Sequence, residues 1–215
     1  MRATFAKSNF SASELYDVYS KLEKIFGEGN VLFIGGRAVN LLCEKNQRPT
    51  HDIDVAVIVP EDKIMDIRRK AIDEGFVILK EKGGMVTSIE TVTPGNKPMQ
   101  IDLYYDRPIS GISIPDLFKK SKKIEKSQGK ETYSFKVANP GHLLVLKYFA
   151  YNEADKNNKE KHLDDIKSLL NTYGGIDIFF SKFEDVIKDL FSEKDYKLFQ
   201  EAIKNIVVFS EILRY

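Results

Sequence analysis

Two neighbouring segments of the sequence constrain the fold more than any other feature. Residues 33–40 read Phe-Ile-Gly-Gly-Arg-Ala-Val-Asn, and residues 52–55 read Asp-Ile-Asp-Val. The first segment predicts a buried strand that meets a glycine turn and then the start of a helix. The second predicts a strand on which Asp52 and Asp54 share one face, because side chains two positions apart in a strand point the same way, while its apolar residues face the core.

The glycine pair and the two aspartates together indicate a site for a phosphate and a metal ion. Mg²⁺ takes one or two carboxylates and completes its shell with water and phosphate oxygens. Gly35 and Gly36 lack a Cβ, so the backbone can approach a phosphate, and the following helix start offers N–H groups and a positive dipole end. Arg37 could add a fixed charge to the β- or γ-phosphate, or it could be a solvent-facing helix residue.

Composition and length exclude several classes of protein. The 215 residues suffice for one large domain or two modest ones, and we expect two packed halves. The net charge of +1 gives no overall field of the kind that marks a nucleic-acid or membrane binder. The one cysteine, Cys43, excludes a disulfide within the chain and is expected to be buried. No signal-peptide-like run or membrane-length apolar stretch is present, so we expect a soluble, cytoplasmic protein.

Hydrophobic periodicity predicts a mixed sheet with flanking helices, followed by helices only. Helices are expected at about 11–26, 37–44 and 61–74, and strands at 31–34, 53–59, 76–79, 86–92, 99–105 and 132–137. Asn139-Pro140 starts the first of four further helices, with asparagine as the cap. The expected fold class is therefore α+β, with a catalytic domain over residues 1–138 and an α-helical domain over residues 139–215 packed against it.

A third acidic residue, Asp102, lies in one of the later predicted strands. Nucleotidyl transfer uses two metal ions about 3.5–4 Å apart, one activating the attacking hydroxyl and one holding the triphosphate, and such a pair needs shared carboxylates. Asp52 and Asp54 would bridge the ions, and Asp102 would complete the hydroxyl-side ion. Three carboxylates that converge without a metal repel one another, which disfavours a purely structural cluster.

These residues resemble the nucleotidyltransferase superfamily typified by DNA polymerase β, in which a Gly-Gly or Gly-Ser turn and a helix precede Asp-x-Asp and a later acid. The nearest resemblance is to the AbiEii-type and MenT-type nucleotidyltransferase toxins of toxin–antitoxin systems. Residues 35–38 match their Gly-Gly-x-Ala opening. Arg48, Thr50, Asp52 and Asp54 match their Arg-x-Thr-x-Asp-x-Asp element.

The resemblance extends into the helical half. The Leu-Lys pair ending at Lys147 fits a helix of these toxins, and residues 161–165 fit their Lys-Asp-x-x-Asp element except that His162 replaces an aspartate. The resemblance implies that Lys147, Lys161 and Asp165 contact the nucleotide or the acceptor.

The same resemblance implies a nucleotidyltransferase fold and a Mg²⁺-dependent enzyme, with Mn²⁺ able to substitute. It would transfer NMP from an NTP to an acceptor hydroxyl and release pyrophosphate. The implied acceptor is the 3′ end of a tRNA or another RNA, and the implied protein partner is a cognate antitoxin. Two alternatives remain open: a small-molecule acceptor of the aminoglycoside type or a protein acceptor, and a non-catalytic partner-binding domain that retains the fold.

Residues 119–136 form the most basic stretch, with seven lysines against two glutamates. Such a run is commonly a solvated surface, yet its position between the two halves would also suit an RNA backbone.

Overall fold

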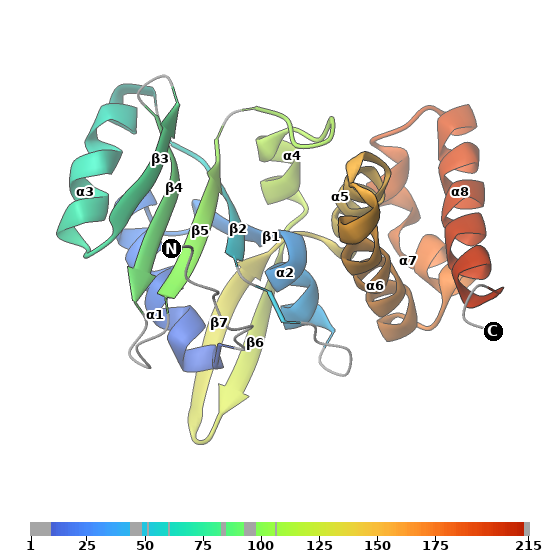
Figure 1. Ribbon diagram of the computed structural model, residues 1–215, viewed down its shortest axis with the longest axis horizontal. Coiled ribbons are helices and arrows are strands. Elements are labelled where there is room, and N and C mark those ends of the chain that lie inside the picture. The colour runs from blue at the N-terminus through green and yellow to red at the C-terminus, as the bar shows by residue number, and fades with distance from the viewer. Residues whose placement is uncertain are drawn as a thin grey trace.

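The computed structural model describes residues 10–43, 49–50, 52–59, 61–82, 85–92, 98–105 and 107–212. One mixed sheet and its packed helices form the first part of the fold, and a group of helices forms the second (Figure 1). This arrangement confirms the predicted α+β class.

The seven-stranded sheet has the order β3-β4-β5-β2-β1-β7-β6. Its strands are β1 (Val31–Ile34), β2 (Asp52–Val57), β3 (Val77–Lys82), β4 (Met85–Val92), β5 (Pro98–Tyr104), β6 (Lys122–Gln128) and β7 (Glu131–Val137). The helices of the first part are α1 (Ala12–Phe26), α2 (Gly35–Leu42), the 3₁₀ helix η2 (Glu61–Asp66), α3 (Ile67–Asp73) and α4 (Ile114–Lys119). Those of the second are α5 (Pro140–Glu153), α6 (Lys156–Thr172), α7 (Ile176–Lys188) and α8 (Glu193–Ile212).

Strand register at the centre of the sheet decides which residues meet. β1 runs antiparallel to β2 and pairs Ile34 with Asp54. β2 runs parallel to β5 and pairs Asp54 with Asp102. A shift of β2 by one residue would turn Asp52 and Asp54 toward the core and Ile53 away from it, so burial holds this register in place.

The lysine-rich stretch begins at the last residue of α4 and forms the β6–β7 hairpin, of which the sequence predicted only β7. Two of its lysines lie over aromatic rings: Lys122 is 5.1 Å from the ring centre of Phe183, and Lys136 is 5.0 Å from that of Phe118. Lys120 pairs with a carboxylate at the end of α7. At least part of this charge therefore holds the protein together rather than facing a partner.

The helical part begins where the sequence predicted. Asn139 caps α5, its Oδ1 accepting a hydrogen bond from the Gly141 N–H at 2.9 Å, and Pro140 occupies the first turn. α5 contacts α2, α6 and α7, which explains why its first eight residues are buried on every side. Within the described residues we find no helix of the length and apolar character needed to cross a bilayer. The boundary between two domains at residue 139 stays a prediction.

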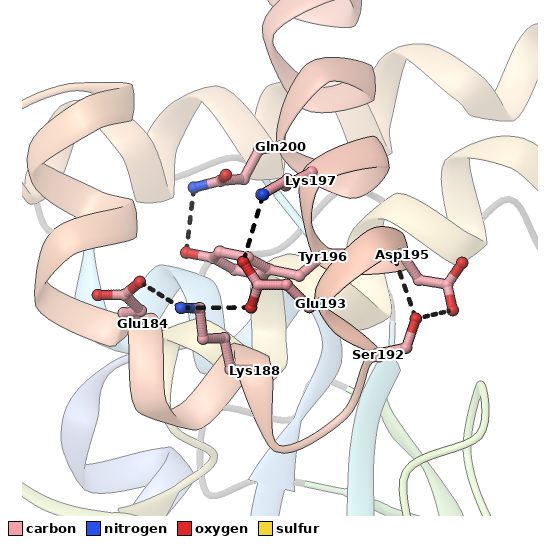
Figure 2. A network of polar contacts seen from close by, with 8 residues as sticks. All are labelled: Glu184, Lys188, Ser192, Glu193, Asp195, Tyr196, Lys197 and Gln200. Carbon is pink, nitrogen blue, oxygen red and sulfur yellow. Dashed lines mark hydrogen bonds and ion pairs between the residues drawn. The ribbon is translucent and has the colours of Figure 1, made fainter.

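A polar network joins the last two helices (Figure 2). Ser192 caps α8, because its Oγ accepts from the Asp195 N–H at 3.2 Å. Lys188 at the end of α7 pairs with Glu184 at 2.9 Å and with Glu193 of α8 at 3.6 Å. These pairs are exposed and so add little stability, but together with the cap they mark where α7 ends and α8 begins.

Candidate active site

Three acidic side chains lie on one face of the central strands. Asp52 is exposed and Asp54 is partly buried, whereas Ile53 between them is fully buried, so the predicted alternation along β2 is confirmed. Asp102 is the register partner of Asp54 on the neighbouring parallel strand and therefore points to the same side. The fold thus gathers all three predicted acids at one place.

Asp54 is the electrostatic centre of this group. Burial, and then the charge of Asp52, raise the pKa of Asp54 to about 6. The charge of Lys147 and a hydrogen bond from the Tyr104 hydroxyl to Asp54 Oδ1, at 3.2 Å, oppose that rise in pKa. A buried carboxylate whose raised pKa is partly offset by a nearby positive charge and a hydrogen bond is typical of a site that binds a cation.

Gly35 stands directly against Asp54. A Cβ at Gly35 would lie 1.9 Å from Asp54 Oδ2, and Gly35 has a φ of +66°, so both space and conformation require glycine. α2 begins at this residue rather than at Arg37 as predicted, and its capping residue Ile34 makes no side-chain cap. The first N–H groups of α2 therefore lie beside the acids, and the capping residue gives them no side-chain hydrogen-bond acceptor.

A cavity of about 190 Å³ brings the sheet and the helices together at this point, and we call it the carboxylate cavity. Its lining comes from β1, α2, β2, β5, the segment after β5, α5 and α6: Ile34, Gly35, Asp54, Tyr104, Ile109, Ser110, Leu146, Lys147, Ala150 and His162. The volume is below the roughly 300–1,000 Å³ usual for a whole ligand and suits the phosphates of a nucleotide.

Lys147 supplies a positive charge to this cavity, and Asp165 holds it in place. Lys147 Nζ lies 2.7 Å from Asp165 Oδ2, with side-chain exposures of 7% and 1%. Asp165 does not line the carboxylate cavity, so its position is that of a partner to Lys147 rather than of a direct contact to a ligand there.

Arg37 and Lys161 are not brought to the carboxylate cavity. Arg37 is buried, with its guanidinium 5.2 Å from the ring centre of Phe10, and it lines a separate cavity of about 230 Å³. Lys161 is exposed on α6 and lines none of the cavities described here. The geometry gives their predicted nucleotide contacts no support.

The remaining residues of the predicted site divide into two groups. Gly36 is buried in the first turn of α2, and Thr50 is buried ahead of β2. Arg48 and His51 lie outside the described residues. Cys43 is buried, as predicted.

The three acids offer the carboxylate oxygens that Mg²⁺ prefers as ligands, but their side chains do not surround a common point. Within the described part of the chain, no group of three or more His, Cys, Asp or Glu side chains is arranged to hold a metal. Asp54 instead accepts from Tyr104, and Asp102 Oδ1 accepts from Gln100 Nε2 at 3.1 Å. Mg²⁺ needs only one or two carboxylates when phosphate and water supply the rest, so the residues fit the ion with its nucleotide better than the ion alone.

Two residues of the site had weaker signals in the sequence. Tyr104 follows Asp102 by two positions and so shares its strand face, which predicts closeness to the acids but not the hydrogen bond to Asp54. Ser110 belongs to the turn Ile109-Ser110-Gly111-Ile112, and a Ser-Gly pair between isoleucines is a recognisable turn signal. Its place beside the cavity depends on tertiary structure.

Comparison with solved structures shows the nucleotidyltransferase fold. The crystal structure of an antigenic nucleotidyltransferase-like protein from Paracoccidioides brasiliensis matches with a TM-score of 0.53 and 15% identity, covering 91% of this chain and 95% of that one. The solution structure of the antibiotic-resistance factor ANT(2″)-Ia matches with a TM-score of 0.51 and 10% identity, covering 83% and 89%. At these identities the likeness concerns the fold.

Comparison of sequences identifies the family. No curated protein matches the chain. A family model described as "Nucleotidyl transferase AbiEii toxin, Type IV TA system" matches residues 17–207, which is most of the chain and includes the acids, Gly35 and Lys147. The chain therefore belongs to the AbiEii nucleotidyltransferase toxin family and is a nucleotidyltransferase enzyme.

Proposed function

We propose that the protein is a Mg²⁺-dependent enzyme that transfers NMP from an NTP to the 3′ hydroxyl of an RNA, with tRNA as the acceptor. The observation that carries the chemistry is the meeting of Asp54, Gly35 and Lys147 in one cavity, with Asp102 in register beside Asp54. A cation site, an anion site and a third acid are the parts that nucleotidyl transfer requires.

The chain's own residues bind and orient the triphosphate. Gly35 leaves room for the Asp54 carboxylate beside the start of α2, and the first N–H groups of α2 can donate to phosphate oxygens. Lys147, held by Asp165, sets a positive charge beside them. The burial of Lys147 strengthens its attraction to a phosphate, because water screens the two charges less there.

Asp52 and Asp54 would hold the metal, and Asp102 would complete the shell on the side of the acceptor. Mg²⁺, when bound, neutralises phosphate charge and makes the acceptor hydroxyl more acidic. In the reaction the hydroxyl oxygen forms a bond to the α-phosphorus while the bond from that phosphorus to the bridging oxygen breaks. Pyrophosphate leaves, and a carboxylate takes the hydroxyl proton; we assign this role to Asp102.

A cognate antitoxin partner is supported by the family description, and the RNA acceptor follows from the resemblance of the sequence motifs to toxins that modify tRNA. Neither rests on the geometry of the carboxylate cavity. The family description names a toxin of a type IV system, and a toxin that modifies tRNA would arrest growth. A small-molecule or protein acceptor would use the same chemistry, and the acceptor is therefore the first point to test.

The test offers several acceptors to the purified protein. It is incubated with each α-³²P-labelled NTP, Mg²⁺ and either total tRNA or an aminoglycoside, and the products are separated. We expect labelled tRNA, lost with EDTA and in Asp54→Asn but kept in Asp73→Asn, a matched change at an exposed aspartate of α3. Label found only on the aminoglycoside or on protein would refute the RNA acceptor, and no transfer to any acceptor would refute the enzyme proposal.

A further inference from the structure

A second, larger cavity adjoins the carboxylate cavity, and we call it the outer cavity. Its volume is about 530 Å³, within the range of ligand sites. The two cavities share Tyr104, Ile109 and Ser110 as a common wall. They lie on opposite sides of β5: the carboxylate cavity is lined from β1 and β2, and the outer cavity from β4 and from Lys82 at the end of β3.

The common wall touches the acids directly. Tyr104 lines both cavities, donates its hydroxyl to Asp54, and lies two residues from Asp102 on the same strand face. A molecule in the outer cavity is therefore one side chain away from the acids. A molecule in the carboxylate cavity approaches them from the side of Gly35.

The rest of the wall is a rigid turn. The backbones of Ile109 and Ile112 exchange two hydrogen bonds of 2.9 Å around Ser110 and Gly111. Both central residues have positive φ, +49° and +81°, as in the tight hairpin turn of type I′. Serine is uncommon in this conformation, and the turn keeps it there at the boundary between the two cavities.

The lining of the outer cavity favours a flat ring. Tyr104, Pro108 and Ile109 give this wall apolar and aromatic surface that is not buried in the core, which suits a nucleobase.

Charge narrows the choice of ligand further. Among the described lining residues, Lys82 and Arg107 are cationic and Glu153 is the one acid. A positive excess attracts phosphate and repels a polycation. This balance argues against an aminoglycoside, which carries several ammonium groups.

We propose that the outer cavity is the acceptor subsite and that it takes the terminal nucleotide of an RNA strand. The base lies against Tyr104 and Pro108, a backbone phosphate lies near Arg107, and the 3′ hydroxyl reaches the acids along Tyr104. This assignment rests on the proposed nucleotidyl transfer and adds to it the place and charge of the acceptor.

The test reverses single charges at the rim. Arg107→Glu should raise the KM for an RNA acceptor about tenfold, and Glu153→Lys should lower it, while the KM for the NTP changes less than about twofold in both. Both side chains are exposed, so neither change disturbs the core. Arg69→Glu on α3 and Glu201→Lys on α8 make the same charge changes at exposed positions that line neither cavity and serve as controls.

Two kinetic results would overturn the acceptor assignment. One is an Arg107→Glu effect on the RNA KM no larger than that of Arg69→Glu. The other is a reversal of both signs, which would indicate a cationic acceptor. Binding of a short fluorescent RNA, measured by anisotropy without NTP, separates the acceptor subsite from the proposed transfer activity. Suppose that wild type binds this RNA and that Arg107→Glu weakens the binding, but that no NMP is transferred to any acceptor. Only the proposal of transfer activity then fails. Absence of RNA binding by wild type overturns the subsite.

Discussion

A Cβ at Gly35 would lie 1.9 Å from Oδ2 of Asp54, so the residue that opens the proposed phosphate-binding turn is in contact with the acid at the centre of the site. The register explains the contact. Ile34, the last residue of β1, pairs with Asp54, and Gly35 follows it immediately. Two motifs that stand 19 positions apart in the sequence thus depend on each other sterically.

Gly35→Ala should remove most transfer activity, because the new methyl group must push the Asp54 carboxylate away or shift the start of α2. Gly129→Ala is a matched control: Gly129 has nearly the same φ, +64° against +66°, and an added Cβ there meets nothing within 4 Å. Both variants should lose about 1 kcal/mol of unfolding free energy from the backbone conformation alone. Activity and stability are measured in parallel, and equal activity loss in both variants would show that the contact with Asp54 is unimportant.

Asp165→Ala should lower the unfolding free energy by about 3–5 kcal/mol, because it leaves Lys147 buried without its counter-charge. The double variant Lys147→Met with Asp165→Leu should regain most of that loss, since an apolar pair can replace a buried ion pair at little cost. Denaturant unfolding measures both. The double variant should have no transfer activity, because it lacks Lys147. Recovery of activity along with stability would mean that Lys147 serves only the fold.

Lys136→Met should destabilise the protein by about 1–2 kcal/mol, because Lys136 lies over Phe118 and donates a hydrogen bond of 3.0 Å to the Gly29 carbonyl. Lys130→Met is the control, since Lys130 is exposed in the turn between β6 and β7. Thermal unfolding should separate the two variants, while the KM for RNA should be similar in both. A raised KM for RNA with unchanged stability would assign Lys136 to an RNA surface instead.

Local patterns predicted much of the fold because they agree with the tertiary structure there. The capping box at Ser11 and Glu14, the alternation in β2 and the Asn139 cap are each satisfied within a few residues. β6 escaped prediction because its sequence, Lys-Lys-Ile-Glu-Lys-Ser-Gln, has a weak strand preference, and pairing with β7 decides its structure.

The site was predictable to the extent that it is built from strands. The two-residue spacing predicts that Asp52 and Asp54 share a strand face. The register of β2 with β5, which the sequence does not reveal, brings Asp102 beside Asp54. The direction of Arg37 is set by the packing of α2 and so could not be read from its place after the glycines. Apolar character alone also misleads at Ile72, which is 54% exposed: Ile67 and Ala71 form the buried face of α3, and Ile72 lies about 100° around the helix from Ala71.

The raised pKa of Asp54 predicts an unusual pH dependence of stability in metal-free protein. Its value in the folded state, about 6, lies above the ordinary 3.8, so the folded state binds this proton more tightly than the unfolded state does. The contribution of Asp54 to stability therefore falls as pH rises from about 4 to 6 and remains unfavourable above that range. Asp54→Asn removes the charge and should be more stable than wild type at pH 7.5 by about 1–3 kcal/mol.

Three measurements test this account of Asp54. Denaturant unfolding in EDTA should give the Asp54→Asn advantage at pH 7.5, and the advantage should shrink toward pH 4.5, where wild-type Asp54 is largely protonated. Adding Mg²⁺ with NTP should raise the melting temperature of wild type but not of the variant, because a ligand that binds only the folded state stabilises it. Asp73→Asn, at an exposed site on α3, should behave like wild type, with no advantage at pH 7.5 and a raised melting temperature with Mg²⁺ and NTP. An Asp54→Asn protein that is less stable than wild type at pH 7.5 would mean that the hydrogen bond from Tyr104 outweighs the burial and repulsion that raise the pKa.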